Sequence, residues 1–156
     1  MDASSTEPLQ LCELAGAAPL AALFADLPEF AGSVDAALVD QRLAGRPALL
    51  LGAFAGGVPV GFKAGYDDGD GVFYSWLGGV HPQWRRGGVA TALLLAQEAW
   101  ARAHGYRELR VKSMNRYPAM LALLIRQGYA VCGYQAPVAG DPFAGKILFG
   151  KRLAPG

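Results

Sequence analysis

Hydrophobic positions change their spacing along this chain after residue 80. Before that point, three apolar stretches of strand length, 47–55, 58–66 and 72–80, follow one another closely. The dipeptide Gly56-Gly57 separates the first two stretches, and glycine tolerates the positive φ that a two-residue hairpin turn needs. These stretches therefore predict a three-stranded antiparallel meander.

The pattern after residue 80 is typical of a helix. Val89, Leu93, Ala96 and Trp100 fall on one face, which predicts a helix over 89–104 that ends at Gly105. The remaining elements that we expect are a strand at 109–113, a helix at 118–127, and strands at 129–135 and 146–153.

The N-terminal part predicts a strand at 8–14 and short helices at 19–27 and 33–43, with Ser33 as the N-cap of the second helix. Residues 1–7 are expected to be a flexible N-terminus. The order of elements predicts an α+β (mixed α/β) fold: a central twisted mixed sheet of about six to seven strands, flanked by about four helices. A crossover helix after residue 80 implies a parallel strand pair there, and one domain over 1–156 fits the length.

Composition narrows the function classes. The chain has 156 residues, of which 53% are hydrophobic and 17% charged, and this composition excludes disorder. Its formal net charge of +1 argues against a general binder of nucleic acid or anionic membranes. Cys12 and Cys132 form no disulfide framework, and we expect both to be core thiols. The polar start lacks the features of a signal peptide and no stretch could span a bilayer, so a cytoplasmic location is expected.

Metal sites are not indicated. His81 and His104 stand far apart without acidic or thiol partners in the sequence, so we expect structural roles for them. The aspartates in 67–71 lack the ligand spacing of a calcium loop and predict a solvated turn.

The most informative segment is 80–94, VHPQWRRGGVATALL. A strand ends, a basic glycine-bearing loop follows, and a helix begins. The first N–H groups of a helix lack internal partners and favour an anion, and Arg85 and Arg86 add positive charge beside them. Neither the Walker pattern nor a dinucleotide fingerprint is present. The segment therefore predicts a pyrophosphate site of another kind.

The pattern Arg85-x-x-Gly88-x-Ala90 resembles the acyl-coenzyme A loop of the GCN5-related N-acetyltransferase (GNAT) family, whose signature is (Gln/Arg)-x-x-Gly-x-(Gly/Ala). Arg86 stands where the family more often has Gly. Downstream, VKSMNRYPAMLALLIRQGYAV resembles the family's second motif, which Asn115 and Gly128-Tyr129 match. The resemblance covers roughly residues 8–153.

This resemblance implies acetyl-CoA as co-substrate, no metal, and direct acetyl transfer to an amine without an acyl-enzyme. Strands 72–80 and 109–113 should splay apart and admit the pantetheine arm along the backbone of Gly78 and Val80, as in β-augmentation. A backbone N–H near Gly78-Gly79 should stabilise the oxyanion. The residues expected to bind the cofactor are Gly78, Val80, Arg85, Arg86, Gly87, Gly88, Val89, Ala90, Thr91 and Asn115.

The acid–base chemistry departs from the family pattern. Neutralising a lysine-like amine at pH 7 costs about 4–5 kcal/mol, which a base, a water chain or desolvation must supply. Many members carry a glutamate on the fourth strand, but Tyr74-Ser75-Trp76 occupies that stretch. Many use a tyrosine as general acid four residues before the Gly-aromatic pair, and Leu124 stands there instead.

Other residues are candidates for these roles. Glu29, in the loop between the first two helices, is a base or an anchor for a cationic acceptor, against the alternative of a solvated carboxylate. Tyr117 is a proton donor to sulfur or simply a packed aromatic. Phe30, Tyr74 and Trp76 line the acceptor pocket or pack in the core, and Tyr74 and Trp76 share a strand face by alternation.

The main hypothesis is an acyl-CoA-dependent N-acetyltransferase with a small-molecule or peptide amine as acceptor. The alternatives are a non-catalytic acyl-CoA-binding sensor on the same fold and a partner-binding domain without a nucleotide. Homodimers are common in the family, so a homodimer is the oligomer that the resemblance suggests.

Overall fold

The computed structural model describes residues 8–155, so the prediction for 1–7 lies outside the described residues. The strands are β1 (Leu9–Glu13), β2 (Ala48–Ala55), β3 (Val58–Asp67), β4 (Val72–Val80), β5 (Glu108–Ser113), β6 (Ala130–Gln135) and β7 (Lys146–Arg152). The α-helices are α1 (Ala21–Asp26), α2 (Ala36–Leu43), α3 (Val89–Ala103) and α4 (Pro118–Arg126). Short 3₁₀ turns are η1 (Ala18–Leu20), η2 (Pro28–Phe30), η3 (Pro82–Trp84) and η4 (Pro142–Ala144).

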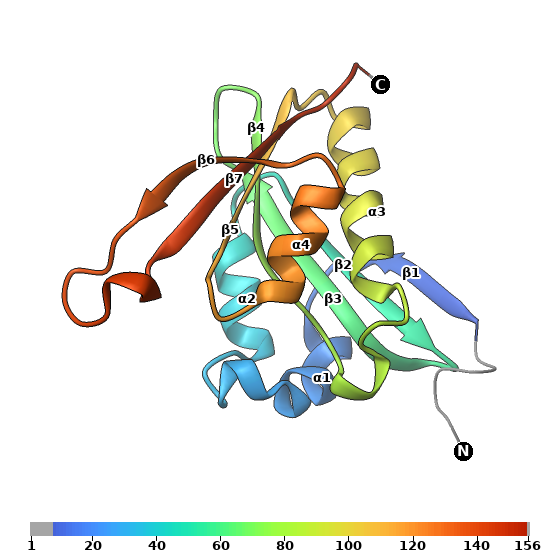
Figure 1. The fold of residues 1–156 in the computed structure, drawn as a ribbon. Helices are drawn as coiled ribbons and strands as arrows, with labels where there is room; N and C mark the ends of the chain where they lie inside the picture. Colours follow the sequence, from blue (N-terminus) through green and yellow to red (C-terminus); the bar gives the residue numbers. More distant parts are fainter. Residues whose placement is uncertain (1–7, 156) are drawn as a thin grey trace.

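The strands form one mixed sheet in the order β1-β2-β3-β4-β5-β7-β6 (Figure 1). Among the strands of residues 8–155, only β4 and β5 pair in parallel, and α3 is the crossover between them. The predicted mixed α/β fold, the meander and the parallel crossover are therefore confirmed. Gly56 and Gly57 have φ values of 56° and 80°, the left-handed conformation that the predicted hairpin turn requires.

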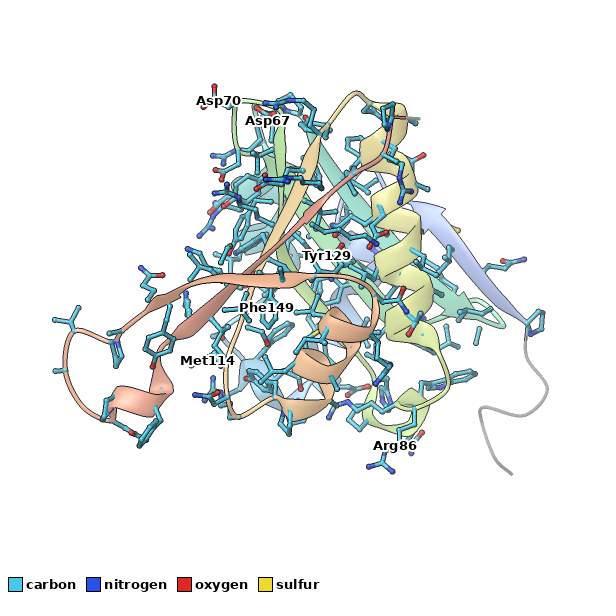
Figure 2. The ribbon with its side chains drawn as sticks, turned by 45° about the horizontal axis from the view of Figure 1, so that its top comes forward. Asp67, Asp70, Arg86, Met114, Tyr129 and Phe149 are labelled. Atoms are coloured by element: carbon cyan, nitrogen blue, oxygen red, sulfur yellow. The ribbon has the colours of Figure 1, made fainter. Side chains whose placement is uncertain are left out.

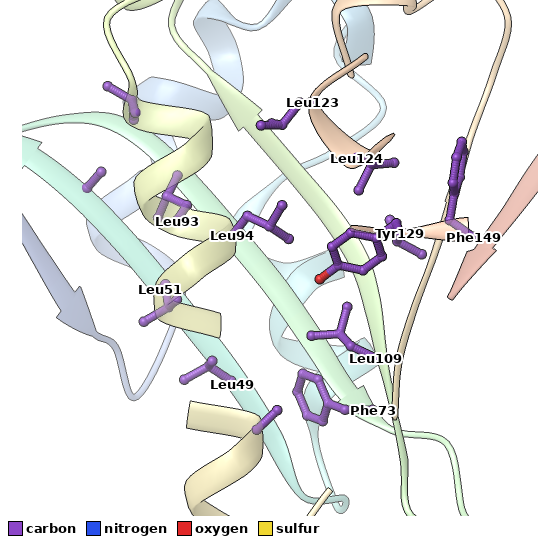
Figure 3. Packing of buried hydrophobic residues seen from close by; sticks show 14 of the residues in the cluster. Leu49, Leu51, Phe73, Leu93, Leu94, Leu109, Leu123, Leu124, Tyr129 and Phe149 are labelled. Carbon is purple, nitrogen blue, oxygen red and sulfur yellow. The ribbon is translucent and has the colours of Figure 1, made fainter. Parts of the chain in front are cut away.

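Helices cover both faces of the sheet, and each face has its own core. One core joins α3 and α4 to the sheet through Leu93, Leu94, Leu124, Phe73 and Phe149 (Figure 3). The other packs α1 and η2 against β3, where Phe24 and Phe30 meet the ring of Phe62 edge-on. We call these two sides of the sheet the α3 face and the α1 face.

Two expectations of detail are wrong. The helix at 36–43 is capped by Asp35, whose Oδ1 accepts a hydrogen bond from the Leu38 amide at 2.8 Å. Ser33 instead donates its hydroxyl to the carbonyl of Phe30. Cys12 and Cys132 are exposed and are not core thiols. Their strands, β1 and β6, are the two edges of the sheet, a position that the apolar pattern of each strand does not reveal.

Candidate functional site

Strands β4 and β5 separate in the middle of the sheet. They pair over four positions, from Val72↔Glu108 to Ser75↔Val111. Beyond that point β4 continues to Val80 along β3, whereas β5 continues to Ser113 along β7. The last five residues of β4 therefore present an edge on the β5 side that no strand of the described chain pairs with. An unpaired backbone edge of this kind can take up an extended ligand by β-augmentation.

A bulge in β4 lies next to this separation. Ala64 faces Leu77 but Gly65 faces Ser75, so Trp76 is the extra residue. The bulge therefore lies two residues before Gly78. Because of the bulge, both Trp76 and Leu77 pack against the core of the α1 face. The bulge directly follows Ser75, the last residue of β4 that pairs with β5.

The loop that leads into α3 is shaped for an anion. Arg86 and Gly88 have φ values of 67° and 86°, so both adopt the left-handed conformation. This explains why glycine is more frequent at the Arg86 position of the family motif. The hydrogen-bond ladder of α3 begins with the Ala92 amide, which donates to the Gly88 carbonyl at 2.9 Å. Within residues 8–155, the amides of 86–91 donate no hydrogen bond of good geometry. This set of free donors at a helix N-terminus fits a diphosphate.

The two arginines of the loop have different partners. Arg85 Nη2 lies 3.1 and 2.9 Å from the carboxylate oxygens of Glu29, and Arg85 Nε donates to the Val80 carbonyl at 3.0 Å. Arg86 forms no ion pair among the described residues. Figure 2 shows it at the end of the molecule opposite Asp67 and Asp70. Arg85 and Arg86 are the two residues predicted to bind phosphate. Glu29 balances the charge of Arg85, whereas no carboxylate of the described residues balances the charge of Arg86.

Glu29 also lies beside the end of β4. A Cβ placed on Gly79 would be 2.8 Å from Leu27 Cδ1 and 3.5 Å from Glu29 Oε1. The absence of a side chain at Gly79 thus allows η2 to approach the strand closely. The structure brings together Glu29, Gly79, Val80 and Arg85, which the sequence predicted separately.

The predicted acceptor residues are on the α1 face but differ in surroundings. Tyr74 and Trp76 both contact the ring of Tyr66, with centroid distances of 5.5 and 6.3 Å, and Arg42 stacks on Trp76 at 4.6 Å. Phe30 is buried against Phe62, so its ring belongs to the core.

A pocket of about 330 Å³ borders the last paired positions of β4 and β5. Its lining residues come from β3, the turn after it, β4, β5, β6 and β7: Tyr66, Asp68, Tyr74, Arg110, Val111, Lys112, Cys132, Leu148 and Phe149. Burial raises the pKa of Tyr74, and the negative charges of Asp68 and of Tyr66 in its ionised form raise it further, so the Tyr74 hydroxyl stays protonated at neutral pH.

The second predicted motif contributes less to the site. Asn115 donates its amide to the Phe143 carbonyl at 2.9 Å, which ties it to the β6–β7 loop. Tyr117 precedes α4, and Arg116 stacks on its ring. Leu124 is fully buried in the core, so no acid replaces the missing tyrosine at that position.

Lys63 is a residue that sequence reasoning missed. It lies in the middle of β3 opposite Gly78, and only 9% of it is exposed. Burial lowers its pKa to about 8, although Glu98 opposes the shift. A single charge inside the apolar stretch VPVGFKAGY was the available signal.

The histidines have partners that the sequence did not suggest. His81 Nε2 lies 3.5 Å from Asp26 Oδ2, which contradicts the expectation that it has no acidic partner. His104 stacks on Trp100 with a centroid distance of 3.9 Å. Both contacts are compatible with structural roles.

The family model of the acetyltransferase (GNAT) family matches residues 18–129. The chain belongs to this family, whose chemistry is acyl transfer. Three solved structures illustrate the shared fold. The GNAT acetyltransferase of Streptococcus pneumoniae has a TM-score of 0.74 at 20% identity, with 94% of this chain and 100% of that chain covered. The ribosomal-protein-S18-alanine N-acetyltransferase of Escherichia coli has a TM-score of 0.79 at 15% identity, with 96% of each chain covered.

The third is a GCN5-related N-acetyltransferase from Kribbella flavida, with a TM-score of 0.75 at 17% identity over 93% of this chain and 98% of that chain. At these identities the structures establish the fold and not the acceptor. A search of curated proteins finds no significant match. Among residues 8–155, the helices are too short or too polar to cross a membrane.

Proposed function

We propose that this protein is an N-acetyltransferase that moves the acetyl group of acetyl-CoA directly to an amine acceptor. The observation that carries the proposal is the combination of free amides at 86–91 with the unpaired edge of β4. Together they offer a site for a diphosphate and, next to it, a backbone edge for an extended amide-bearing arm.

The donor half of the site follows from these elements. The amides at the start of α3, from Gly87 to Thr91, hold the diphosphate, and Arg86 supplies positive charge. The backbone of Gly78 and Val80 pairs with the amides of the arm. An N–H at Gly78-Gly79 donates to the acyl oxygen as negative charge develops on it.

The acceptor approaches from the α1 face, where Tyr74 and Trp76 provide an aromatic surface beside the pocket. Glu29 flanks this side at Gly79, but Arg85 contacts both oxygens of its carboxylate. Both carboxylate oxygens of Glu29 are therefore engaged by Arg85 and are not free to contact an acceptor amine. We therefore infer that Glu29 positions the loop through Arg85 and that desolvation or water deprotonates the amine.

A second candidate is a non-catalytic sensor of acyl-CoA. The buried Leu124 in place of the usual acid and the neutralised Glu29 favour it. Such a protein would bind acetyl-CoA through the same loop but release no thiol.

Two measurements test these functions. Calorimetric titration with coenzyme A should give saturable binding, and absence of heat at millimolar ligand would overturn both candidates. Thiol release from acetyl-CoA is then measured with a panel of amines and corrected for hydrolysis. Amine-dependent release supports the transferase, whereas binding without release by any amine class supports the sensor.

A further inference from the structure

The α3 face of β3 and β4 carries a buried cation. Gly61 lies two residues before Lys63 and Gly65 lies two residues after it. Both glycines face α3, because a Cβ on Gly61 would contact Val89 and Leu93, and a Cβ on Gly65 would contact Gln97. By alternation, Lys63 points to the same side. Its Nζ lies 3.6 Å from the place that a Cβ of Gly78 would occupy. The ammonium group therefore lies over Gly78, the residue whose backbone borders the unpaired edge of β4.

Lys63 is a buried cation without a carboxylate partner in the described part of the chain. None of the side-chain hydrogen bonds or ion pairs among residues 8–155 involves its ammonium group. The nearby Glu98 is already engaged by the Tyr129 hydroxyl, Lys151 and Arg102. Proteins rarely bury a lysine unpaired, because the desolvation is not compensated. This position therefore points to a ligand.

Other polar atoms on the same face also lack partners. Ser75 Oγ and both side-chain polar atoms of Gln97 are buried and form no hydrogen bond within the described residues. Gln97 Nε2 lies 2.9 Å from a Cβ placed on Gly65, and Gly65 is the strand partner of Ser75. Ser75 is also the last β4 residue paired with β5. Unsatisfied polar groups thus surround the point where the strands separate.

We propose that Lys63 is the general acid of the donor half-site and protonates the coenzyme A sulfur as acyl transfer proceeds. This inference rests on the proposed function. As the acceptor nitrogen bonds to the acyl carbon and the carbon–sulfur bond breaks, Lys63 Nζ gives one proton to the sulfur. This step leaves Lys63 as a neutral amine. The acceptor nitrogen releases one proton as the amide forms, and this proton restores the ammonium form of Lys63.

The chemistry of the two groups is well matched. A proton is transferred efficiently when the acid and the leaving group have similar pKa values. Burial brings the pKa of Lys63 to about 8, close to that of an alkyl thiol at about 8.5. Many family members use a tyrosine at the position of Leu124 to protonate the sulfur. The buried leucine side chain cannot donate a proton, and Lys63 would supply that proton instead.

The first test needs no acceptor and does not measure activity. The chain has four lysines, so nuclear magnetic resonance of carbon-13-labelled lysine can follow each one, with Lys63→Met to assign the signal. Added coenzyme A should shift the Lys63 signal and its titration midpoint, while exposed Lys146 stays unchanged. A Lys63 signal that does not respond at coenzyme A saturation, as monitored by calorimetry, would overturn the inference. Absence of coenzyme A binding would instead contradict the proposed function.

The second test uses kinetics with whichever amine the panel yields. Lys63→Met should lower kcat about 10- to 100-fold and leave the KM for acetyl-CoA within about threefold. The fall of kcat above pH 8 in the wild type should disappear, and Lys63→Arg should not restore activity because arginine does not release its proton. Lys146→Met is the matched control. An unchanged kcat and pH profile in Lys63→Met would exclude the role.

Discussion

Glu29 and Arg85, which are 56 residues apart, form an ion pair through both carboxylate oxygens, and Arg85 also donates to the carbonyl of Val80. The pair joins η2 on the α1 face to the loop that precedes α3. It therefore connects the acceptor side of the proposed site to its donor side. The charge of Arg85 is balanced locally, which leaves Arg86 as the cation available to an incoming diphosphate.

Substitution of Arg86 should therefore weaken the binding of coenzyme A. Arg86→Met should lower the affinity about three- to tenfold, and less so at high salt, because it removes an unbalanced charge near the phosphates.

Glu29→Gln should tighten the binding of coenzyme A about two- to threefold at low salt, because it frees the charge of Arg85. Calorimetry at two salt concentrations measures both changes, with the exposed Arg126→Met as control. Equal affinities for Arg86→Met and wild type would contradict this assignment of the phosphate site.

Gly88 allows a sharper test, because its surroundings are empty. It has a φ of 86° and no atom within 4 Å of a Cβ placed on it, so Gly88→Ala adds backbone strain without a clash. Gly57 has a φ of 80°, is equally open, and lies in the β2–β3 turn. Both alanine variants should lose about 1–2 kcal/mol of unfolding free energy. Only Gly88→Ala should also lose coenzyme A affinity, by about tenfold, since it redirects the amides that start α3. Equal affinity of the two variants would argue against that anion site.

Tyr129 should be important for stability. Its hydroxyl donates to Glu98 Oε2 at 2.7 Å, while Lys151 and Arg102 contact Oε1. Burial and this bond raise the pKa of Tyr129 far above its ordinary value, so it remains a donor throughout the neutral range. Tyr129→Phe leaves one buried carboxylate oxygen without a partner and should cost about 1–3 kcal/mol of unfolding free energy in urea. Tyr66→Phe is the control, because the Tyr66 hydroxyl forms no hydrogen bond in the described chain. This variant should change the free energy of unfolding little.

The elements of the fold could be predicted because their signals are local. The Gly-Gly turn, the strand-length apolar stretches of the meander and the helical spacing after residue 88 each depend on neighbours in sequence, as does the basic loop before α3. The partners of the site residues could not be predicted. The Glu29–Arg85 pair depends on where η2 crosses β4, and the exposure of Cys132 depends on β6 being an edge strand. Lys63 was hidden for the same reason, since only the sheet order places it beside Gly78.

Lys63 also makes stability depend on pH in a direction that can be checked. Burial lowers its pKa from 10.5 to about 8. Between these values the unfolded chain binds a proton that the folded chain does not, so the free energy of unfolding rises with pH over this window. Below pH 8 the folded state carries the full cost of the buried charge, about 3 kcal/mol from the size of the shift.

Lys63→Met removes that cost and should be more stable than the wild type at pH 7, by up to about 3 kcal/mol. The difference should narrow toward pH 10, because wild-type Lys63 is then neutral in the folded state and the cost of burying its charge is relieved. Urea denaturation at both pH values measures this, with Lys146→Met expected to match the wild type at each. If Lys63→Met is less stable at pH 7, or if the difference is the same at pH 10, Lys63 is not a buried unpaired cation. A gain in stability accompanied by a loss of kcat would instead identify Lys63 as a residue kept at the expense of stability because the reaction requires its proton.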